Sequence, residues 1–262
     1  KKNIILDYDD AAFHHYDKSN NSIIKKILHD KIYRLVQLAD HVITGSPYLT
    51  EVLSAYTKNI TEIPTSIDFE KYENAVVAEN KNDDAFVIGW IGSKTTSKNM
   101  LDIKDAFIQL QQKGKFCLAL IGFDKFQEDE LNGINHILYK WDEATEVSLL
   151  KSFDAGIMPL TNTPFNNGKC GFKLVQYMAS GLPTISTPLA ANVKINRSGE
   201  NKHATTVEEW VFAIESMAVQ KEHYKNVVGK KNIEIAKEYY SIQSNYKKYL
   251  QLFSMLINKK NN

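Results

Sequence analysis

The sequence predicts an α/β protein in which helices cover both faces of parallel sheets, and three observations lead to this fold class. Apolar runs such as IILDY, FVIGWIG and FCLALIG alternate along the chain with longer segments whose apolar residues have helical spacing. The apolar runs are not interrupted by polar residues at every second position, which is typical of buried parallel strands. A charged, polar stretch at residues 69–84 divides the pattern into two series. We therefore expect two Rossmann-like domains joined by a linker.

The length of 262 residues suits two modest domains, which we place at residues 1–67 and 68–238, followed by a terminal helical segment at 239–262. The chain begins KKNIILDYDD, without a methionine and directly with a strand. We expect this strand to lie inside the first domain, so the first domain is expected to be incomplete.

The first domain is expected to contain three strands and two helices. IILDY at residues 4–8 is the first strand, and residues 22–40 have the apolar spacing of a helix. Ser46 and Pro47 are a favourable N-cap and first residue for a short helix over PYLTEVLSAY. HVITG and TEIPTSID supply the other two strands.

The second domain repeats the pattern. Strands are expected at FVIGWIG, FCLALIG, HILYKW, AGIMPL and TIST. Ser97 is expected to cap a helix from Lys98 to Gln112, and a shorter helix is expected from Glu143 to Ser152. TVEEWVFAIESMAV and a lysine-rich segment are helical in pattern.

The last helix, SNYKKYLQLFSML, has one expected apolar stripe, made by Tyr246, Leu250, Phe253 and Leu256. Such a stripe fits a helix that crosses back to the first domain, and it also fits a helix that packs on its own domain.

Composition excludes several classes of function. The formal net charge of +1 gives no overall attraction to nucleic acid or to an anionic membrane, so any anion has to be bound by local groups. Cys117 and Cys170 are too far apart in sequence for a metal-binding knuckle and are typical of reduced cytoplasmic thiols. No apolar run approaches the length of a membrane span, and the first residues lack the pattern of a signal peptide. We expect a cytoplasmic protein without a nucleic-acid partner.

A first candidate anion site follows the strand FVIGWIG, at the carboxyl edge of the sheet where ligands bind in open α/β folds. The strand ends at Gly92 and Ser93, and a polar loop leads to Lys98. Glycine allows the backbone to approach a ligand closely, and free N–H groups with a lysine suit a diphosphate. A plain strand-to-helix turn with a serine cap explains the same residues equally well.

A second candidate lies in GKCGFKLVQYMASGLPTISTP, residues 168–188. A helix starting near Gly171 directs its unpaired N–H groups and the positive end of its dipole at any ligand there. Its expected apolar face consists of Phe172, Val175, Met178 and Ala179, and its expected polar stripe of Lys173, Gln176, Tyr177 and Ser180. The polar stripe is either a solvated face or part of a nucleotide site. The second is favoured because both candidates combine glycine and lysine at strand ends of one sheet.

These segments resemble the C-terminal half of the GT-B glycosyltransferases, which contain two Rossmann-like domains, and in particular the retaining family 4 (group 1). The resemblance is carried by IGWIGSKTTSK, DAGIMPL and GFKLVQYMASGLPTIST, and in the first domain by DYDDAAF, ADHVITGSPYL and EIPTSIDFEKY. It implies transfer of a sugar from a nucleotide-sugar donor to a glycan or lipid-linked acceptor, with no metal or other cofactor required. It also implies a terminal helix that crosses back to the first domain, and a role in bacterial capsule or lipopolysaccharide synthesis.

The resemblance also implies residue roles. Gly92 matches the loop glycine that approaches the donor phosphates, and Lys98 matches the lysine that pairs with the diphosphate. Gly171 and Phe172 match the helix-entry pair whose N–H groups meet the phosphate or the donor sugar. No protein nucleophile is evident, so retention is expected to depend on front-face attack assisted by the leaving phosphate.

The chain departs from this family at several positions. The two glutamates of the family's E-x7-E motif fall on Gly168 and Gln176, of which only the glutamine is able to bind ribose hydroxyls. The family's loop arginine falls on Ser93. Lys169 and Lys173 are expected to restore positive charge near the diphosphate, as in a GKCGFKLxQYMA subgroup that this chain resembles.

The segment DYDDAAFHHYD offers a further set of polar groups. Asp7, Asp9 and Asp10 have the carboxylates that a hard cation prefers, but clustered acids at a strand end are more often helix caps, and we expect no metal. Asp10, His14 and His15 are instead expected to hold acceptor or donor-sugar hydroxyls, with histidine able to assist proton transfer. Exposed loop histidines are the alternative.

Two other functions remain open. One is a GT-B nucleotide-sugar epimerase, which needs acids and histidines at other positions of the cleft. The other is a non-catalytic nucleotide-binding assembly protein, which the loss of both family carboxylates favours. The sequence leaves open whether the protein associates with the inner face of the membrane and which oligomeric state it adopts.

Overall fold

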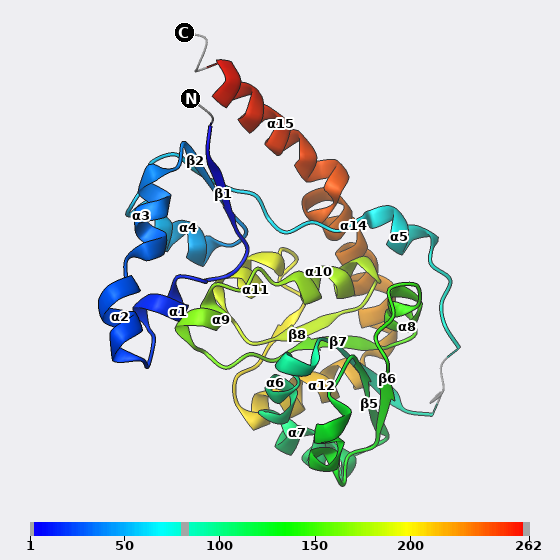
Figure 1. Ribbon diagram of the computed structural model, residues 1–262. Coiled ribbons are helices and arrows are strands. Elements are labelled where there is room, and N and C mark those ends of the chain that lie inside the picture. The colour runs from blue at the N-terminus through cyan, green and yellow to red at the C-terminus, as the bar shows by residue number, and fades with distance from the viewer. Residues whose placement is uncertain (1–2, 80–83, 259–262) are drawn as a thin grey trace.

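The computed structural model describes residues 3–79 and 84–258, which form two parallel-sheet units joined by a linker (Figure 1). A three-stranded sheet has the order β1-β2-β3, and a six-stranded sheet has the order β6-β5-β4-β7-β8-β9. Every strand pair in both sheets is parallel. The predicted fold class is confirmed.

The first sheet packs helices on one of its faces. Its strands are β1 (Ile5–Tyr8), β2 (His41–Thr44) and β3 (Ile60–Glu62). Its helices are α1 (His14–Asp17), α2 (Ser22–Leu28), α3 (Lys31–Leu38) and α4 (Pro47–Ser54). The helix expected over residues 22–40 is thus divided in two, because the chain turns at His29 and Asp30. As expected, α4 begins at Pro47, with the Ser46 hydroxyl accepting the N–H of Leu49.

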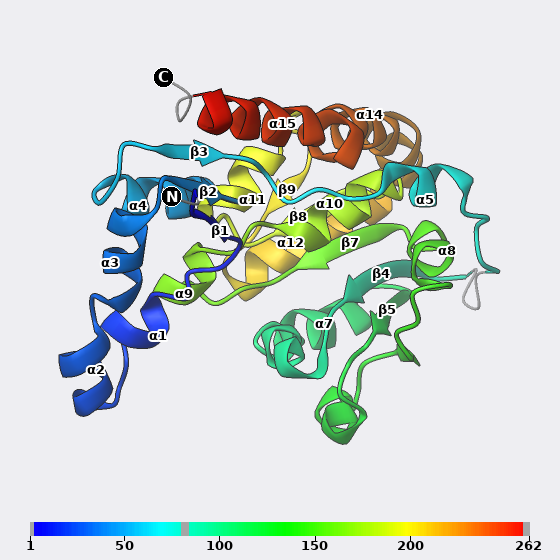
Figure 2. The ribbon, with the colours of Figure 1, turned by 45° about the horizontal axis from the view of Figure 1, so that its top comes forward.

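The other face of the first sheet is covered by the last helix of the chain. Helix α15 (Ile242–Asn258) runs from the second unit across to β2 and β3, as Figure 2 shows. Its Leu252 and Leu256 form a buried cluster with Ile43 and Ile63. The terminal helix therefore crosses back and closes a layer of the first domain.

The apolar stripe expected for this helix is wrong in three of its four residues. Tyr246, Leu250 and Phe253 are 46%, 55% and 40% exposed, and only Leu256 is buried. The packing face of α15 is rotated from the expected one because it follows Ile43 on β2 and Ile63 directly after β3, which lie far from α15 in the sequence.

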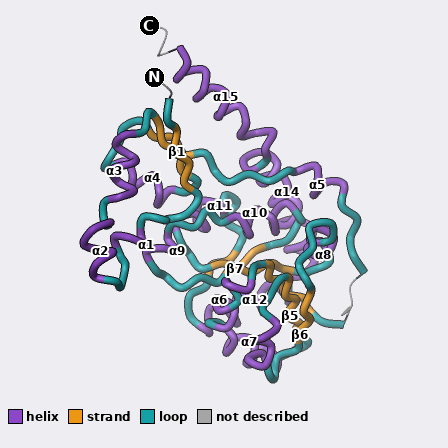
Figure 3. The backbone as a smooth tube through the Cα atoms, viewed as in Figure 1, coloured by secondary structure: helices purple, strands orange, loops and turns teal. Residues whose placement is uncertain are grey.

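The linker contains a helix where a purely polar connection was expected. Helix α5 (Phe69–Asn74) interrupts an otherwise irregular segment (Figure 3). The Asp68 carboxylate accepts the N–H of Glu70 and caps the helix. Phe69 and Tyr72 are buried in the core of the second unit. The linker is therefore attached to the second sheet; its residues 80–83 lie outside the described ranges.

The second sheet is buried on both faces. Its strands are β4 (Phe86–Ile91), β5 (Phe116–Ile121), β6 (His136–Tyr139), β7 (Ala155–Met158), β8 (Thr184–Ser186) and β9 (Lys202–His203). Alternate residues of β4 enter opposite cores: Val87 and Ile91 enter one, and Ile88 and Trp90 enter the other. This two-sided burial explains the continuous apolar runs in the sequence.

Two helical layers enclose this sheet. On one side are α5, α8 (Glu146–Lys151), α10 (Phe172–Ala179) and α14 (Gly229–Tyr240). On the other are α6 (Lys98–Leu101), α7 (Lys104–Gln111) and α12 (Val207–Val219). The remaining short elements are η1 (Lys94–Thr96), η2 (Lys125–Leu131), α9 (Pro164–Asn167), α11 (Ala190–Ile195), α13 (Lys221–His223) and the π-helical turn η3 (Tyr224–Val228). The helix expected from Lys98 to Gln112 is divided at Asp102, whose carboxylate accepts the hydroxyl of Thr161.

The order of strands reverses between β4 and β7. Strands β4, β5 and β6 follow one another toward one edge of the sheet, and β7, β8 and β9 toward the other. Strand β4 pairs with β5 over six residues but with β7 only at Ile88–Ala155 and Gly89–Gly156. The carboxyl ends of β4 and β7 therefore part, and this switch point is where open α/β sheets bind their ligands.

Substitution of Leu252 by alanine tests the docking of α15. The side chain is 6% exposed, so its truncation is expected to lower the free energy of unfolding by about 2–5 kcal/mol. Leu250→Ala is a matched control on the same helix, and its effect is expected to stay below about 0.5 kcal/mol. Urea unfolding followed by circular dichroism measures both. Equal losses for the two variants would contradict the packing described.

Candidate active site

The hydroxyl of Tyr177, on α10, joins β4 and β7 where their backbones part. It accepts a hydrogen bond from the N–H of Ile91 at 3.0 Å and donates one to the carbonyl of Ile157 at 3.0 Å. Burial raises the pKa of this hydroxyl above its ordinary value, so it remains a donor at neutral pH. Its ring lies over Gly156, where a Cβ atom would stand 2.3 Å from the ring. This side chain therefore fixes α10 across the carboxyl edge of the sheet.

Helix α10 begins at the residue expected from the sequence. Gly171 precedes it with a left-handed φ of 72°, and a Cβ atom there would stand 2.3 Å from the side chain of Ile195. In the described chain no side chain caps α10, and the N–H groups of Phe172 and Lys173 are too near the helix start to have intrahelical acceptors. These donors, with the positive end of the helix dipole, are available to an anion.

The expected polar stripe of α10 is not a solvated face, which was the less favoured of its two interpretations, and one member of the expected apolar face, Phe172, is exposed. Gln176, Tyr177 and Ser180 are buried, whereas Phe172 is 41% exposed. Helix α10 is enclosed by the sheet, α5 and α14, so side chains on nearly all sides of it are covered. The polar residues are therefore part of the interior or of a cavity wall.

The residue that caps the helical segment after β4 also differs from the one expected. Ser93 precedes η1: its N–H donates to the Thr96 hydroxyl at 3.1 Å, and its carbonyl accepts the N–H of Thr96 at 2.9 Å. The expected cap, Ser97, is buried within the helical segment, and its hydroxyl accepts the N–H of Asp124 at 2.9 Å. The helical segment thus begins one turn earlier than expected.

Two cavities lie along the carboxyl edge of the second sheet, with volumes of about 1300 Å³ and about 930 Å³. Of the residues expected in the site, Gly92, Ser93 and Gln176 line the larger cavity. Asp10, Lys98, Lys169 and Gly171 line the smaller one. Thr96, Phe172 and Lys173 line both, and we call these three residues the junction. Nine of the residues expected in the site thus lie around two adjoining spaces, whereas His14 and His15 line neither of them.

The larger cavity has a wall that sequence analysis did not find. Lys71, on α5, bonds the Glu146 carboxylate at 2.9 Å, and the other oxygen of Glu146 accepts the indole N–H of Trp141 at 2.7 Å. Trp141 is half exposed and lines the cavity. The hydrogen bond to Glu146 holds its ring in a fixed orientation at the cavity wall. The available sequence signal was the strand end, because Trp141 is the last residue of the expected strand HILYKW and lies two residues beyond β6.

The linker also contacts Gln176, the residue that is predicted to bind the ribose of the nucleotide. Burial raises the pKa of the Tyr72 hydroxyl to about 12, and a hydrogen bond from the side chain of Gln176 opposes this rise. Gln176 is 6% exposed and lines the larger cavity. Its amide is thereby positioned by α5. Lys94 on η1 lines the same cavity and was also missed, although it stands in the quoted loop GSKTTSK.

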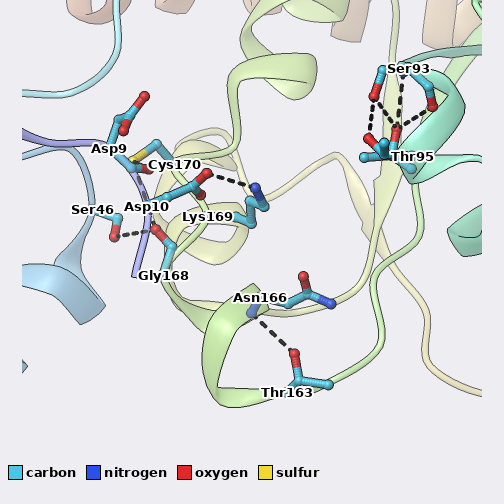
Figure 4. Close-up of polar contacts among 11 residues, drawn as sticks. Asp9, Asp10, Ser46, Ser93, Thr95, Thr163, Asn166, Gly168, Lys169 and Cys170 are labelled. Carbon is cyan, nitrogen blue, oxygen red and sulfur yellow. Dashed lines mark hydrogen bonds and ion pairs between the residues drawn. The ribbon is translucent and has the colours of Figure 1, made fainter. Parts of the chain in front are cut away.

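The two units meet at the loop before α10, as Figure 4 shows. The Lys169 amine lies 2.9 Å from the Asp10 carboxylate, and the Cys170 thiol donates to the carbonyl of Asp9 at 2.8 Å. A Cβ atom at Gly168 would stand 2.7 Å from the backbone nitrogen of Ala11. The first unit thus occupies the space that a side chain at position 168 would need.

Lys173 is set apart from the other lysines of the site. Its amine lies 4.4 Å from the centroid of the Trp90 ring, and no ion pair to it exists among the described residues. Burial and the neighbouring charge of Lys169 lower the pKa of Lys173 to about 8. A half-buried amine without a carboxylate is an available cation for an anionic ligand.

His14 does not belong to the site. It is buried, and neither cavity is lined by it. Its Nδ1 lies 2.8 Å from the Asp17 carboxylate and its Nε2 lies 2.8 Å from the Tyr48 hydroxyl. Because both ring nitrogens are engaged inside the first unit, the expected contact with an acceptor is wrong. His15 is exposed, with its ring centroid 4.8 Å from that of Phe165.

Within residues 3–79 and 84–258, no group of three or more histidine, cysteine, aspartate or glutamate side chains is arranged to hold a metal ion. None of the helices in the same ranges combines the length and apolarity needed to cross a membrane.

Tyr177→Phe tests the bridge between β4 and β7. Loss of the hydroxyl leaves the Ile91 N–H and the Ile157 carbonyl without their partner, which is expected to lower the free energy of unfolding by about 1–3 kcal/mol. Tyr246→Phe, at an exposed hydroxyl, is the matched control and is expected to have no measurable effect. Denaturant unfolding compares the two variants. An unchanged stability for Tyr177→Phe would remove the bridge from this account.

Comparison with known proteins places the chain in a family. Residues 85–219, just over half of the chain, match the family model described as glycosyl transferases group 1. A relative is TuaH of Bacillus subtilis (strain 168), a glycosyltransferase assigned to teichuronic acid biosynthesis. It is 22% identical over 187 residues, which cover 66% of this chain and 46% of TuaH. The chain therefore spans less than half the length of that relative.

Solved structures share the architecture over nearly the whole chain. Sucrose-phosphate synthase from Thermosynechococcus elongatus has a TM-score of 0.76 and 13% identity, covering 97% of this chain and 68% of its own. Anabaena HepE in complex with UDP-glucose has a TM-score of 0.74 and 13% identity, covering 98% and 72%. A glycosyltransferase from Rickettsia africae has a TM-score of 0.72 and 12% identity, covering 97% and 70%. These likenesses establish the fold, GT-B, and with the family match they lead to one conclusion: the chain belongs to the group 1 glycosyltransferases.

Proposed function

We propose that this protein transfers a sugar from a nucleotide-sugar donor to a glycan or lipid-linked acceptor in the synthesis of a bacterial surface polysaccharide. The observation that carries the proposal is the meeting of two cavities at the start of α10, where unpaired N–H groups and lysines converge. One cavity suits a nucleoside and the other a sugar with its acceptor, and the anionic diphosphate belongs between them.

The nucleoside occupies the larger cavity in this proposal. Gln176 has an amide that both donates and accepts, which suits the two hydroxyls of a ribose. Trp141 presents a ring held by Glu146, and an aromatic ring in a fixed orientation favours stacking with a nucleobase. Both contacts involve the linker, through Tyr72 and Lys71, so nucleoside binding is coupled to the segment that joins the domains.

The diphosphate lies at the start of α10 and accepts hydrogen bonds from the N–H groups of Gly171 and Phe172. Gly92 allows the opposite loop to approach, and Lys98 adds a cation from the smaller cavity. The diphosphate gains negative charge as the glycosidic bond breaks. These donors and the helix dipole therefore stabilise the transition state more than the bound donor, which is the condition for catalysis.

The donor sugar and the acceptor share the smaller cavity. Asp10 of the first unit and Lys169 of the second line this cavity and form an ion pair across the interface between the domains. Gly168 offers no carboxylate to the donor sugar, and Ala11 occupies the space where one would stand. We propose retention of configuration by front-face attack assisted by the leaving phosphate, without a metal ion or other cofactor.

The biological setting follows from the kind of acceptor. TuaH is assigned to teichuronic acid biosynthesis, and a wall or capsular glycan built on a lipid carrier is the corresponding acceptor class for this chain. Nucleotide sugars are cytoplasmic metabolites, so we place the reaction in the cytoplasm, at the inner face of the membrane where a lipid carrier is accessible.

Calorimetric titration with UDP-glucose, GDP-mannose and ADP-glucose tests the proposal. At least one donor is expected to bind, and Lys98→Ala is expected to weaken it by about tenfold or more, because a charged hydrogen bond contributes about 1.5–3 kcal/mol. Lys113→Ala, a lysine paired with Glu215 outside both cavities, is the matched control. Absence of binding for every donor would end the enzyme proposal. Binding without transfer to any glycan extract would favour a non-catalytic assembly protein.

Gln176→Ala separates the ribose contact from the diphosphate contact. The variant is expected to bind a nucleoside diphosphate more weakly while its affinity for inorganic pyrophosphate stays unchanged, since pyrophosphate has no ribose. The same titrations in wild-type protein provide the reference. Equal losses for both ligands would exclude a ribose role for Gln176.

A further inference from the structure

We propose that Lys173 binds the donor diphosphate and takes up a proton as it does so, so that the junction acquires its full positive charge only when the nucleotide is present. The inference rests on the proposed function, because it assigns a regulation to the same diphosphate site. The resemblance already implies that the charge of Lys173 lies near the diphosphate, and the inference adds the proton that accompanies binding.

The position of Lys173 is the first support. It lines both cavities, and its backbone N–H lies in the uncapped first turn of α10. Its amine is held 4.4 Å from the centroid of the Trp90 ring, which is fully buried and therefore fixed in place. The Lys173 side chain therefore borders the same two cavities that meet at the uncapped helix start.

The lack of a carboxylate partner is the second support. In the described chain, Lys169 is bound to Asp10 and Lys71 to Glu146, so their charges are already compensated. No ion pair or side-chain hydrogen bond to the Lys173 amine occurs in the same ranges. Contact with an aromatic face compensates an ammonium only in part, and the amine is half-buried.

The charged groups around the junction do not supply the missing partner. In the smaller cavity they are Lys98, Lys169, Asp9 and Asp10. In the larger cavity the acids are Asp68, Glu128, Glu143 and Glu146, and the other lysines are Lys71, Lys94, Lys125 and Lys140. Lys169 is the charge with a resolved effect on Lys173, and it repels the ammonium form.

These surroundings make the charge of Lys173 dependent on the ligand. Burial, followed by repulsion from Lys169, lowers the pKa of Lys173 to about 8, so about half of the amines are neutral at pH 8 in the empty cleft. A bound diphosphate favours the ammonium form and raises this pKa again. The binding energy from this contact is therefore complete below pH 8 and is lost as the pH rises from 8 toward the bound-state value.

Calorimetry detects the proton directly. UDP, GDP and ADP are titrated into the intact chain at pH 8 in Tris and in HEPES, and the tightest of the three is used throughout. The difference in heat between the two buffers is expected to correspond to uptake of about half a proton per nucleotide. Between pH 7 and pH 9 the affinity is expected to fall about tenfold.

Two substitutions at position 173 separate the effect of the positive charge from the effect of proton uptake. Lys173→Arg keeps the charge at every pH tested, so it is expected to bind the nucleotide without proton uptake and without the fall in affinity. Lys173→Met removes the cation and is expected to bind about 10- to 100-fold more weakly, also without uptake. Lys98→Met is the control, expected to weaken binding while leaving the uptake in place.

The outcomes distinguish the two proposals. If none of the three nucleotides binds wild-type protein, the proposed function fails and the inference fails with it. If a nucleotide binds but no proton is taken up, or if uptake persists in Lys173→Arg, the inference alone is overturned. A merely structural Lys173 would lower the unfolding midpoint in Lys173→Met without changing the buffer dependence of the binding heat.

Discussion

One hydroxyl group, that of Tyr177, joins the two strands that border the cleft. The strand order reverses between β4 and β7, and open α/β sheets bind their ligands at such a switch point. The two strands pair only at two positions, and the phenol bridges Ile91 and Ile157 beyond them. The same bridge ties α10 to the edge, so the helix start and the gap between the strands are placed by one side chain. Gly156 is required because the ring occupies the space of a Cβ atom there.

Positively charged side chains are concentrated near the start of α10, where the backbone N–H groups have no acceptor within the helix. The family's loop arginine is replaced by Ser93, whose polar groups are used in the turn before η1. The segment after β4 keeps Lys94 and Lys98, and the segment at the start of α10 adds Lys169 and Lys173, which differ in state. Lys169 is neutralised by Asp10 of the first domain, which ties the lobes together, whereas Lys173 rests on an indole. Anion binding and the contact between the domains therefore meet within one loop of the second domain.

Local patterns were sufficient for the parts of the structure that local forces determine. The fold class, the strands β1 to β8 and the start of α10 after Gly171 follow from apolar runs and from glycine and proline positions, whereas the two-residue strand β9 was not predicted. The predictions that failed concern residues whose positions depend on contacts between segments distant in the sequence. Leu252 rather than Leu250 faces the first sheet because it packs with Ile43 and Ile63. His14 lies away from the cavities because its ring bonds the Tyr48 hydroxyl. The spacing of apolar residues in the sequence does not indicate which distant residues they contact. The place of Trp141 at a strand end could have been found from the sequence. Its hydrogen bond to Glu146, which holds the ring in position, could not.

The most direct test of the account is a crystal structure of the intact chain with a bound nucleoside diphosphate. The account predicts the nucleoside in the larger cavity, with the phosphates within about 3 Å of the N–H groups of Gly171 and Phe172, the distance of a hydrogen bond. The amine of Lys173 is predicted to have left the Trp90 ring for a phosphate oxygen. A nucleotide bound elsewhere, or phosphates that leave the start of α10 unoccupied, would contradict the central claim.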